Sequence, residues 1–314
     1  MVRILLILLA LTAAPTRQAA AATLKPLDLR DGRPLNVVTT VNMVSDLVRN
    51  VGGDRVRVTE LMGPGVDPHL YKASAGDVRK LAFADAVFYA GLHLEGKMVE
   101  LLEKMQRAVA VTDTIPRSSL LRPDGALGGT YAYDPHVWFD VTLWSKTVEA
   151  VRRALGQLDP GGRATYDRNA ASYRERLATL DAFVKRELAR IPRPQRVLVT
   201  AHDAFAYFGR RYGVEVRGLQ GLSTSAEAGT RDVRALVDFV VERRIRAIFV
   251  ESSVPRRTLE AVAAAARSRG HALVIGGELF SDAAGEPGTV EGTYVGMIEH
   301  NVKTIVAGLL GGAS

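Results

Sequence analysis

Short β-branched runs alternate with longer amphipathic patterns along most of the chain, and this alternation leaves few folds open. Strand patterns separated by helical patterns are typical of βα units, which build parallel sheets covered by helices. The first half has four such runs, at Asn36–Thr40, Val56–Leu61, Ala86–Ala90 and Val109–Thr112. The second half has four more, at Val197–Thr200, Val214–Leu219, Ala247–Glu251 and Leu273–Gly276. We therefore expect an α/β protein with two lobes, each a four-stranded parallel sheet flanked by helices.

One stretch between the two halves, from about Gly162 to Ile191, has a helical pattern without interruption. Its apolar residues recur at steps of three and four, at Tyr166, Ala170, Tyr173, Leu177, Leu180, Val184 and Leu188. A helix of roughly 30 residues is about 45 Å long, enough to run along two lobes. We expect one long connecting helix, whose stiffness would confine opening of a cleft between the lobes to local loop movement.

The N-terminus has the pattern of an export signal. Arg3 is followed by the apolar run Ile4–Ala13 and by the small residues Ala19–Ala22. The apolar run is shorter than the roughly 20 residues that a membrane helix needs. We expect cleavage near Thr23 and the order signal peptide 1–22, N-terminal lobe 23–160, connecting helix 161–192 and C-terminal lobe 193–314.

Composition excludes several classes of protein. The chain has no cysteine, which excludes a disulfide, a thiolate metal site and a cysteine-linked lipid anchor. The formal net charge is +7, of which Arg3 and Arg17 contribute two, leaving +5 without the signal. Basic pairs such as Arg152–Arg153 are scattered among acidic residues, which does not indicate a nucleic-acid surface. We expect a monomer that is free in the periplasm and does not bind nucleic acid.

Three of the six histidines follow strand patterns at positions where α/β proteins place ligands. These are His69, His136 and His202. The tripeptide Asp-Pro-His occurs twice, as Asp67–His69 and Asp134–His136, and its proline restricts the backbone before the imidazole. The aspartate of each tripeptide can accept a hydrogen bond from the ring or from a backbone N–H. The pattern favours a preorganised metal site over three unrelated surface histidines.

The other three histidines carry no ligand signal. The apolar neighbours of His93 predict a packed or hydrogen-bonded ring, whereas His271 and His300 are typical of surface or helix-end positions.

A closed site needs a fourth ligand, because three imidazoles leave one tetrahedral position open to water. Asp282, just beyond the last strand pattern, is the favoured candidate. Glu251 at the end of the preceding strand is an alternative, and Glu278 is a weaker one. Either glutamate could instead support a ligand from outside the site.

Several stretches resemble the metal-binding solute receptors of ABC transporters, the cluster A-I family, and especially its TroA-like zinc and manganese members. The most specific are GVDPHLYKASAGDV, GLHLEGKM, DPHVWFD, TAHDAFAYFGRRYGVEV, GLQGLSTSAEA, IFVESSVP, and GGELFSDAAG followed by GTYVGMIEHN. The resemblance covers nearly the whole chain after the signal. It implies two α/β lobes joined by one long helix, with the metal buried between them.

The resemblance also implies which residues bind the metal. The family's ligands fall on His69 and His136 from the first lobe and on His202 and Asp282 from the second. One Zn²⁺ or Mn²⁺ per chain would be carried to an ABC transporter permease in the inner membrane, without catalysis.

The choice of metal stays open at this point. Zinc-dedicated relatives usually carry a histidine-rich loop, whereas the loop Thr114–Tyr133 here has no histidine. Manganese-dedicated relatives commonly have glutamate at the third ligand, where this chain has His202. Nitrogen-rich sites suit zinc, but a bidentate carboxylate can also accommodate manganese.

Two other functional classes are compatible with a metal site. A zinc hydrolase would use similar ligands, but it keeps one coordination position open, and the chain has no His-Glu-x-x-His helix or nucleophile elbow. A metal-binding adhesin would need surface display, for which the chain offers no anchoring cysteine. A receptor for sugars or amino acids is disfavoured because aromatic residues are only 6% of the chain.

Overall fold

The computed structural model describes residues 24–29, 32–123 and 131–311. The expected signal peptide and residues 124–130 of the loop Thr114–Tyr133 lie outside the described residues. Within the described ranges, no helix is both long enough and apolar enough to cross a membrane.

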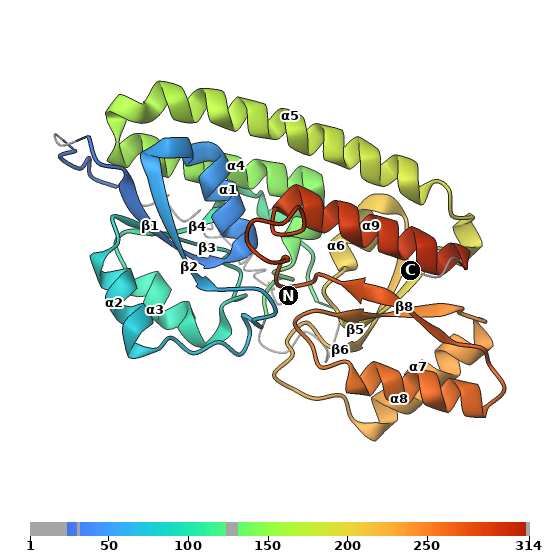
Figure 1. Cartoon of the computed structure of the whole chain (residues 1–314). Helices are drawn as coiled ribbons and strands as arrows, with labels where there is room; N and C mark the ends of the chain where they lie inside the picture. Colours follow the sequence, from blue (N-terminus) through green and yellow to red (C-terminus); the bar gives the residue numbers. More distant parts are fainter. Residues whose placement is uncertain (1–23, 30–31, 124–130, 312–314) are drawn as a thin grey trace, which may run out of the picture.

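The first half of the chain forms a four-stranded parallel sheet with helices on both faces (Figure 1). Its strands have the order β2–β1–β3–β4 and are β1 (Leu35–Val41), β2 (Val56–Met62), β3 (Ala86–Tyr89) and β4 (Ala108–Ala110). Its helices are α1 (Asn42–Gly52), α2 (Ala75–Phe83), α3 (Val99–Lys104) and α4 (Val141–Leu158). The central strand β1 is buried at all but one position, as its continuous β-branched sequence predicts.

The second half contains the four predicted strands, and each pairs in parallel with a neighbour. They are β5 (Val197–His202), β6 (Glu215–Gln220), β7 (Ala247–Glu251) and β8 (Val274–Leu279). The expected single sheet is divided into two ladders, β5–β6 and β7–β8. The ends of β5 and β7 are joined by a side chain. The Glu251 carboxylate at the end of β7 accepts the backbone N–H of His202 at the end of β5, at 2.8 Å.

Four further helices cover these strands (Figure 1). They are α6 (Ala206–Tyr212), α7 (Thr230–Glu242), α8 (Arg257–Ser268) and α9 (Tyr294–Leu310). Short 3₁₀ turns complete the fold, at Gly53–Arg55, Gly96–Met98, Val111–Thr114, Arg117–Ser119, Val137–Phe139, Pro160–Gly162 and Arg193–Gln195. Figure 1 shows α7 and α8 on the outer side of the strands, and α6 and α9 between the strands and the long helix.

The predicted long helix is α5 (Arg163–Leu188), with 26 residues and a length of about 39 Å. It runs along both halves and packs on α1 and α4 of the first half and on α6 and α9 of the second (Figure 1). All seven apolar residues predicted to face the protein are buried. The helix also buries Asp181, which binds Arg211 and Tyr212 of α6. The prediction of an α/β fold with parallel sheets and one long helix is confirmed.

Two helix ends have local causes in the sequence. Ser74 and Asp77 form a capping box at the start of α2. Gly213 ends α6 with a left-handed φ of 70°, which glycine adopts without a Cβ penalty.

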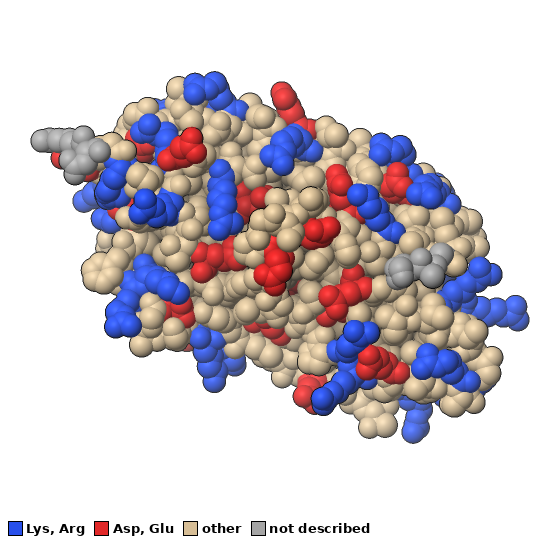
Figure 2. Space-filling view, viewed as in Figure 1, with Lys and Arg blue, Asp and Glu red and all other residues tan. Residues whose placement is uncertain are grey.

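Charges are mixed on the face shown in Figure 2. Lys and Arg side chains are spread among Asp and Glu side chains there, and no continuous basic surface is visible. Many of the arginines are paired with acids, including Arg152 with Glu149 and Asp167 and Arg243 with Glu215.

Candidate metal centre

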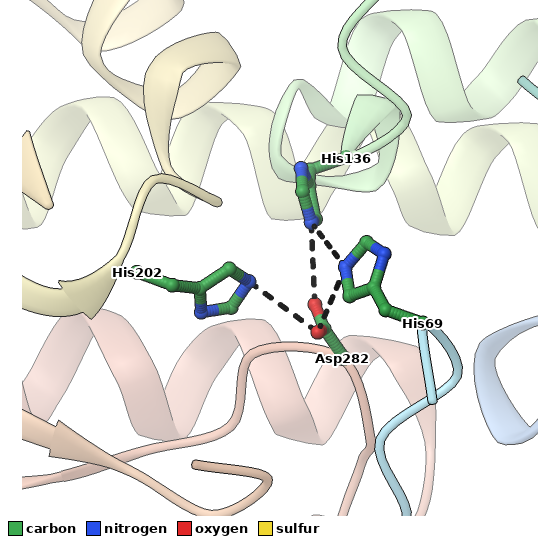
Figure 3. Close-up of side chains that lie close together, drawn as sticks. All are labelled: His69, His136, His202 and Asp282. Carbon is green, nitrogen blue, oxygen red and sulfur yellow. Dashed lines mark hydrogen bonds and ion pairs between the residues drawn. The ribbon is translucent and has the colours of Figure 1, made fainter. Parts of the chain in front are cut away.

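Four side chains from four separate segments meet in one buried cluster between the two halves (Figure 3). His69 lies in the loop after β2, and His136 in the loop before α4. His202 is the last residue of β5, and Asp282 follows β8. Each is at most 2% exposed. The structure therefore brings together all four residues that the sequence analysis selected.

The atoms that face one another are the Nε2 atoms of the histidines and the carboxylate oxygens of Asp282. His69 Nε2 is 3.3 Å from His136 Nε2 and 3.4 Å from an Asp282 oxygen. Asp282 oxygens are 3.5 Å from His136 Nε2 and 3.3 Å from His202 Nε2. Ligands about 2.0 to 2.1 Å from a tetrahedral zinc ion are about 3.3 to 3.4 Å apart. These four contacts have the spacing of ligands in a tetrahedral site, and one ligand atom from each of the four residues lies within 4.8 Å of the others.

Each histidine uses its other ring nitrogen to contact an oxygen of a fixed partner. His136 Nδ1 is 2.7 Å from Asp134 Oδ1, and His202 Nδ1 is 2.6 Å from Glu251 Oε2. His69 Nδ1 is 3.0 Å from the hydroxyl of Tyr131. A neutral imidazole that donates from Nδ1 to a carboxylate keeps its Nε2 lone pair free. These contacts therefore orient the three rings so that their Nε2 atoms face the same point.

The two Asp-Pro-His tripeptides are held differently. Asp134 Oδ1 accepts both the backbone N–H of His136, at 2.9 Å, and the ring contact. Asp67 Oδ1 accepts only the backbone N–H of His69, at 2.9 Å. The other oxygen of Asp67 accepts the hydroxyl of Thr224, which belongs to the second half. The first tripeptide thus links the two halves beside the cluster.

Two glycines allow close packing behind the cluster. A Cβ on Gly96 would lie 2.6 Å from the carbonyl oxygen of His69. A Cβ on Gly218 of β6 would lie 2.7 Å from the carbonyl carbon of His202. Both distances are shorter than a Cβ tolerates, so any larger residue would displace a histidine backbone.

The charges within the cluster shift the pKa values of His202 and Asp282. Burial alone would lower the pKa of His202, but the carboxylates of Glu251 and Asp282 raise it well above its usual range. Burial alone would raise the pKa of Asp282, but the imidazoles of His202, His69 and His136 hold it well below its usual range. His202 Nε2 and Asp282 Oδ2 are 3.3 Å apart, so each group favours the charged form of the other.

Three polar atoms of the cluster make no hydrogen bond to the described residues. His202 Nε2 and both oxygens of Asp282 are buried without a hydrogen-bond partner among the described residues. Buried polar atoms are normally satisfied, so atoms such as these require an explanation. Three imidazole nitrogens and one carboxylate oxygen form a donor set that suits zinc.

Glu251 and Glu278, the alternative acidic ligands, lie outside the cluster. Glu251 is 2% exposed, and its two oxygens contact the backbone N–H and the ring Nδ1 of His202. Glu278 is exposed, and its backbone carbonyl oxygen is 3.1 Å from His300 Nε2. Glu251 is therefore placed to orient His202.

The remaining histidines lie apart from the cluster. His271 Nε2 contacts the carbonyl oxygen of Ile245 at 2.6 Å, as expected for a helix-end residue. His93 is exposed, but its ring lies edgewise beside that of Tyr131 with centroids 6.4 Å apart, so the expected packing is limited to one aromatic contact. The residues Gly91, Leu92 and His93 all have positive φ, and this turn buries Leu94 and Glu95 instead.

Sequence reasoning missed Tyr131, the partner of His69. Tyr131 lies in an irregular loop, 62 residues from His69, and no spacing pattern links the two. The aromatic residues beside the cluster were likewise not selected, although Trp138 stacks edgewise on His136 with ring centroids 5.2 Å apart.

Comparisons with known proteins agree with this architecture. The sequence profile of the family described as "Zinc-uptake complex component A periplasmic" matches residues 37–308. The chain is 51% identical over 282 residues to the zinc-binding protein TroA of Treponema pallidum, covering 89% of this chain and 90% of that protein. It is 49% identical over 278 residues to the manganese-binding lipoprotein MntA of Bacillus subtilis, covering 88% and 90%.

A solved structure supports the same relationship. The structure of the periplasmic zinc-binding protein TroA from Treponema pallidum superposes with a TM-score of 0.84 at 50% identity, covering 88% of this chain and 99% of that one. The profile match spans most of the chain, and both curated relatives exceed 30% identity over nearly their whole length. The chain belongs to the family of the periplasmic component A of the zinc-uptake complex.

Proposed function

We propose that this chain is a periplasmic solute-binding protein that captures one divalent transition metal ion and delivers it to an ABC importer. The observation that carries the proposal is the buried cluster of His69, His136, His202 and Asp282, whose ligand atoms all lie within 4.8 Å of one another. Two ligands come from each half of the chain, so a bound ion would connect the halves. Family membership supports a role in metal uptake.

Zinc is the metal that the donor set favours. Three imidazole nitrogens and one carboxylate match the preference of zinc for nitrogen-rich tetrahedral sites, and the usual affinity order places zinc above manganese. The relatives divide on this point, because one is named for zinc and another for manganese. We infer that zinc binds more tightly than manganese to the purified protein.

The partner in this account is the permease of an ABC transporter in the inner membrane. The chain would act as a monomer, freely diffusing in the periplasm after signal cleavage. Several of its relatives are named lipoproteins. This sequence has no cysteine to carry a lipid, which supports diffusion without an anchor.

A zinc hydrolase fits the cluster less well. Hydrolytic zinc sites keep one position for water, and they need a general base that reaches this water. In the proposed site Asp282 would fill the fourth position, and both oxygens of the nearby Glu251 already contact His202. An adhesin role has no specific observation in its favour.

Competitive loading tests the proposal. Protein refolded without metal would be titrated with zinc and manganese against a chelator, with metal content measured by elemental analysis. We expect one zinc per chain, at least about tenfold tighter binding of zinc than of manganese, and a higher melting temperature with zinc. Tighter manganese binding would reverse the choice of metal, and hydrolysis of esters, peptides or phosphates by the zinc form would contradict a transport role.

A further inference from the structure

The fourth side chain of the cluster is supported differently from the three histidines. Each histidine has a partner at Nδ1 that fixes its ring. Beyond the imidazoles 3.3 to 3.5 Å away, the Asp282 carboxylate has no hydrogen-bond partner among the described residues. Its position must therefore be fixed through the main chain.

Two buried asparagines bind that main chain on both sides of Asp282. Two residues before it, Phe280 donates its backbone N–H to Asn301 Oδ1 at 2.9 Å, and Asn301 Nδ2 donates to the Phe280 carbonyl at 2.7 Å. Two residues after it, Ala284 donates its N–H to Asn42 Oδ1 at 2.8 Å, and Asn42 Nδ2 donates to the Ala284 carbonyl at 3.3 Å. Each amide therefore pairs with a peptide group as a neighbouring strand would.

The two asparagines come from different halves of the chain. Asn42 is the first residue of α1 in the first half and is 5% exposed, whereas Asn301 lies within α9 and is 2% exposed. The Asn42 pair thus spans 242 residues and attaches the Asp282 segment to the half that carries His69 and His136.

Two further hydrogen bonds hold Ser281, the residue before Asp282. Trp138 Nε1 donates to the Ser281 carbonyl at 3.1 Å, and the hydroxyl of Ser281 pairs with that of Ser253 at 2.8 Å. Trp138 is itself held by the hydroxyl of Tyr294, which donates to its carbonyl at 2.7 Å. The backbone at residues 280, 281 and 284 is therefore tied to both halves.

We propose that Asn42 and Asn301 are positioning residues of the metal site, which hold the Asp282 carboxylate in place and slow release of the metal. The inference rests on the proposed function. A ligand whose backbone is fixed loses little conformational entropy when the metal binds. The Asp282 segment can move away from the metal only after these amide hydrogen bonds break. The bonds therefore slow release of the metal by movement of this loop.

The test compares Asn42→Ala with Asn50→Ala in the full mature chain. Asn50 is on the same helix, and its amide contacts Asp46 and Arg176 instead of the Asp282 segment. Zinc affinity would be measured by chelator competition, and zinc dissociation by a chelator chase. We expect Asn42→Ala to weaken zinc binding about 10- to 100-fold, as loss of outer supports of a metal ligand does, with most of the change in the dissociation rate. Asn50→Ala should bind as wild type does.

A double-mutant cycle separates positioning from general stability. If Asn42 acts through Asp282, then Asn42→Ala should cause no further loss of affinity in an Asp282→Ala background. The same cycle with Asn301→Ala should give the same result. A lower melting temperature of metal-free Asn42→Ala, with unchanged zinc affinity and dissociation rate, would show a structural role only and overturn the inference. An equal loss in both backgrounds would also overturn it.

Two outcomes need separate treatment. If Asn42→Ala does not fold, Ser253→Ala tests the same segment, because it removes the hydroxyl that pairs with Ser281. This variant should also speed zinc release, and an unchanged rate would contradict the inference. If the wild-type protein itself does not bind zinc or manganese, the proposed function fails, and the inference fails with it. If the wild-type protein binds zinc and the asparagine variants have the same zinc affinity and dissociation rate, the inference fails but the proposed function stands.

Discussion

His202 and Asp282 are the two residues that the second half contributes to the candidate metal site, and both are fully buried. We expect His202→Ala and Asp282→Ala each to reduce zinc affinity by more than about 100-fold, because each removes a proposed ligand. Glu251→Gln should cost about 10- to 100-fold, since it weakens the contact that orients His202. Chelator competition on the purified variants measures this order.

The matched controls are the three histidines outside the cluster. His93→Ala, His271→Ala and His300→Ala should bind zinc as wild type does. If Asp282→Ala kept wild-type affinity while Glu251→Gln abolished binding, Glu251 would be the fourth ligand and the assignment of Asp282 would be wrong.

Zinc binding should depend on pH through His202. The carboxylates of Glu251 and Asp282 raise the pKa of this imidazole well above its usual range, and metal binding needs the neutral ring. The proton must leave, so zinc affinity should keep rising above the ordinary histidine pKa of about 6.5, by about tenfold per pH unit for each proton released. Titrations across this range measure the slope, and a flat affinity would show that the histidines do not bind the metal.

The raised pKa of His202 has the opposite effect on the stability of the metal-free protein, which should fall as pH rises. A histidine whose pKa is raised on folding stabilises the native state below the unfolded pKa of about 6.5, and this contribution is lost as pH rises through the folded pKa. Zinc should therefore raise the melting temperature more at high pH than at low pH.

The sequence alone selected the four residues of the cluster, but it did not reveal most of the side chains that hold them in place. The repeated Asp-Pro-His tripeptide marks His69 and His136 because proline and aspartate act locally on the imidazole. The contacts of Tyr131 and Asn42 depend on segments 62 and 242 residues apart in the chain. No local pattern encodes such contacts, so only the fold shows them.

Among the elements, α4 and α5 are joined by a cluster of charges around Glu149. Hydrogen bonds from the Arg152 side chain, with Arg153 and Arg174 nearby, lower the pKa of Glu149 to about 2. Arg174 belongs to α5, so this carboxylate links the connecting helix to the first half. Its side chain is 23% exposed, and solvent screening reduces the strength of the link.

Glu149→Gln should lower the free energy of unfolding by about 1 kcal/mol or less at pH 7. The depressed pKa means that this stabilisation is present above the unfolded glutamate pKa of about 4.3, and that it is lost as pH falls through about 2. Urea unfolding at several pH values should show wild type and variant converging in acid. Glu175→Gln, an exposed position on α5, is the control, and an equal loss there would assign the effect to helix charge alone.

The connecting helix shows which features of an element its sequence encodes. Apolar spacing of three and four predicted the seven buried positions because those residues share one face of a helix. It did not predict buried Asp181, whose burial depends on Arg211 and Tyr212 of α6. The strand patterns of the second half have the same limit. They predicted four strands but not their division into two ladders, because strand pairing depends on tertiary packing.

Across the whole molecule, side-chain contacts tie the two halves together around the cluster. Tyr207 of α6 donates to the carbonyl of Asp134, Asp67 accepts from Thr224, and Asn42 pairs with Ala284. The division into lobes at residues 23–160 and 193–314, with a connector at 161–192, remains a prediction. These ties and the packing of α5 on both halves favour small local changes over wide hinge opening.

Small-angle scattering tests this expectation. The metal-free and zinc-loaded proteins should have the same radius of gyration within error, because α5 and the contacts between the halves resist rotation of one half against the other. A clear decrease in size on zinc binding would demonstrate hinge closure and remove this part of the account, while the ligand assignment would stand.

The central claim is that one metal ion binds to three Nε2 atoms and one carboxylate oxygen, and anomalous diffraction at the zinc absorption edge tests it most directly. Crystals of the zinc-loaded protein should show a single strong anomalous peak about 2.0 to 2.2 Å from His69, His136, His202 and Asp282. A peak at any other place, or a peak here with water in place of Asp282, would contradict the account.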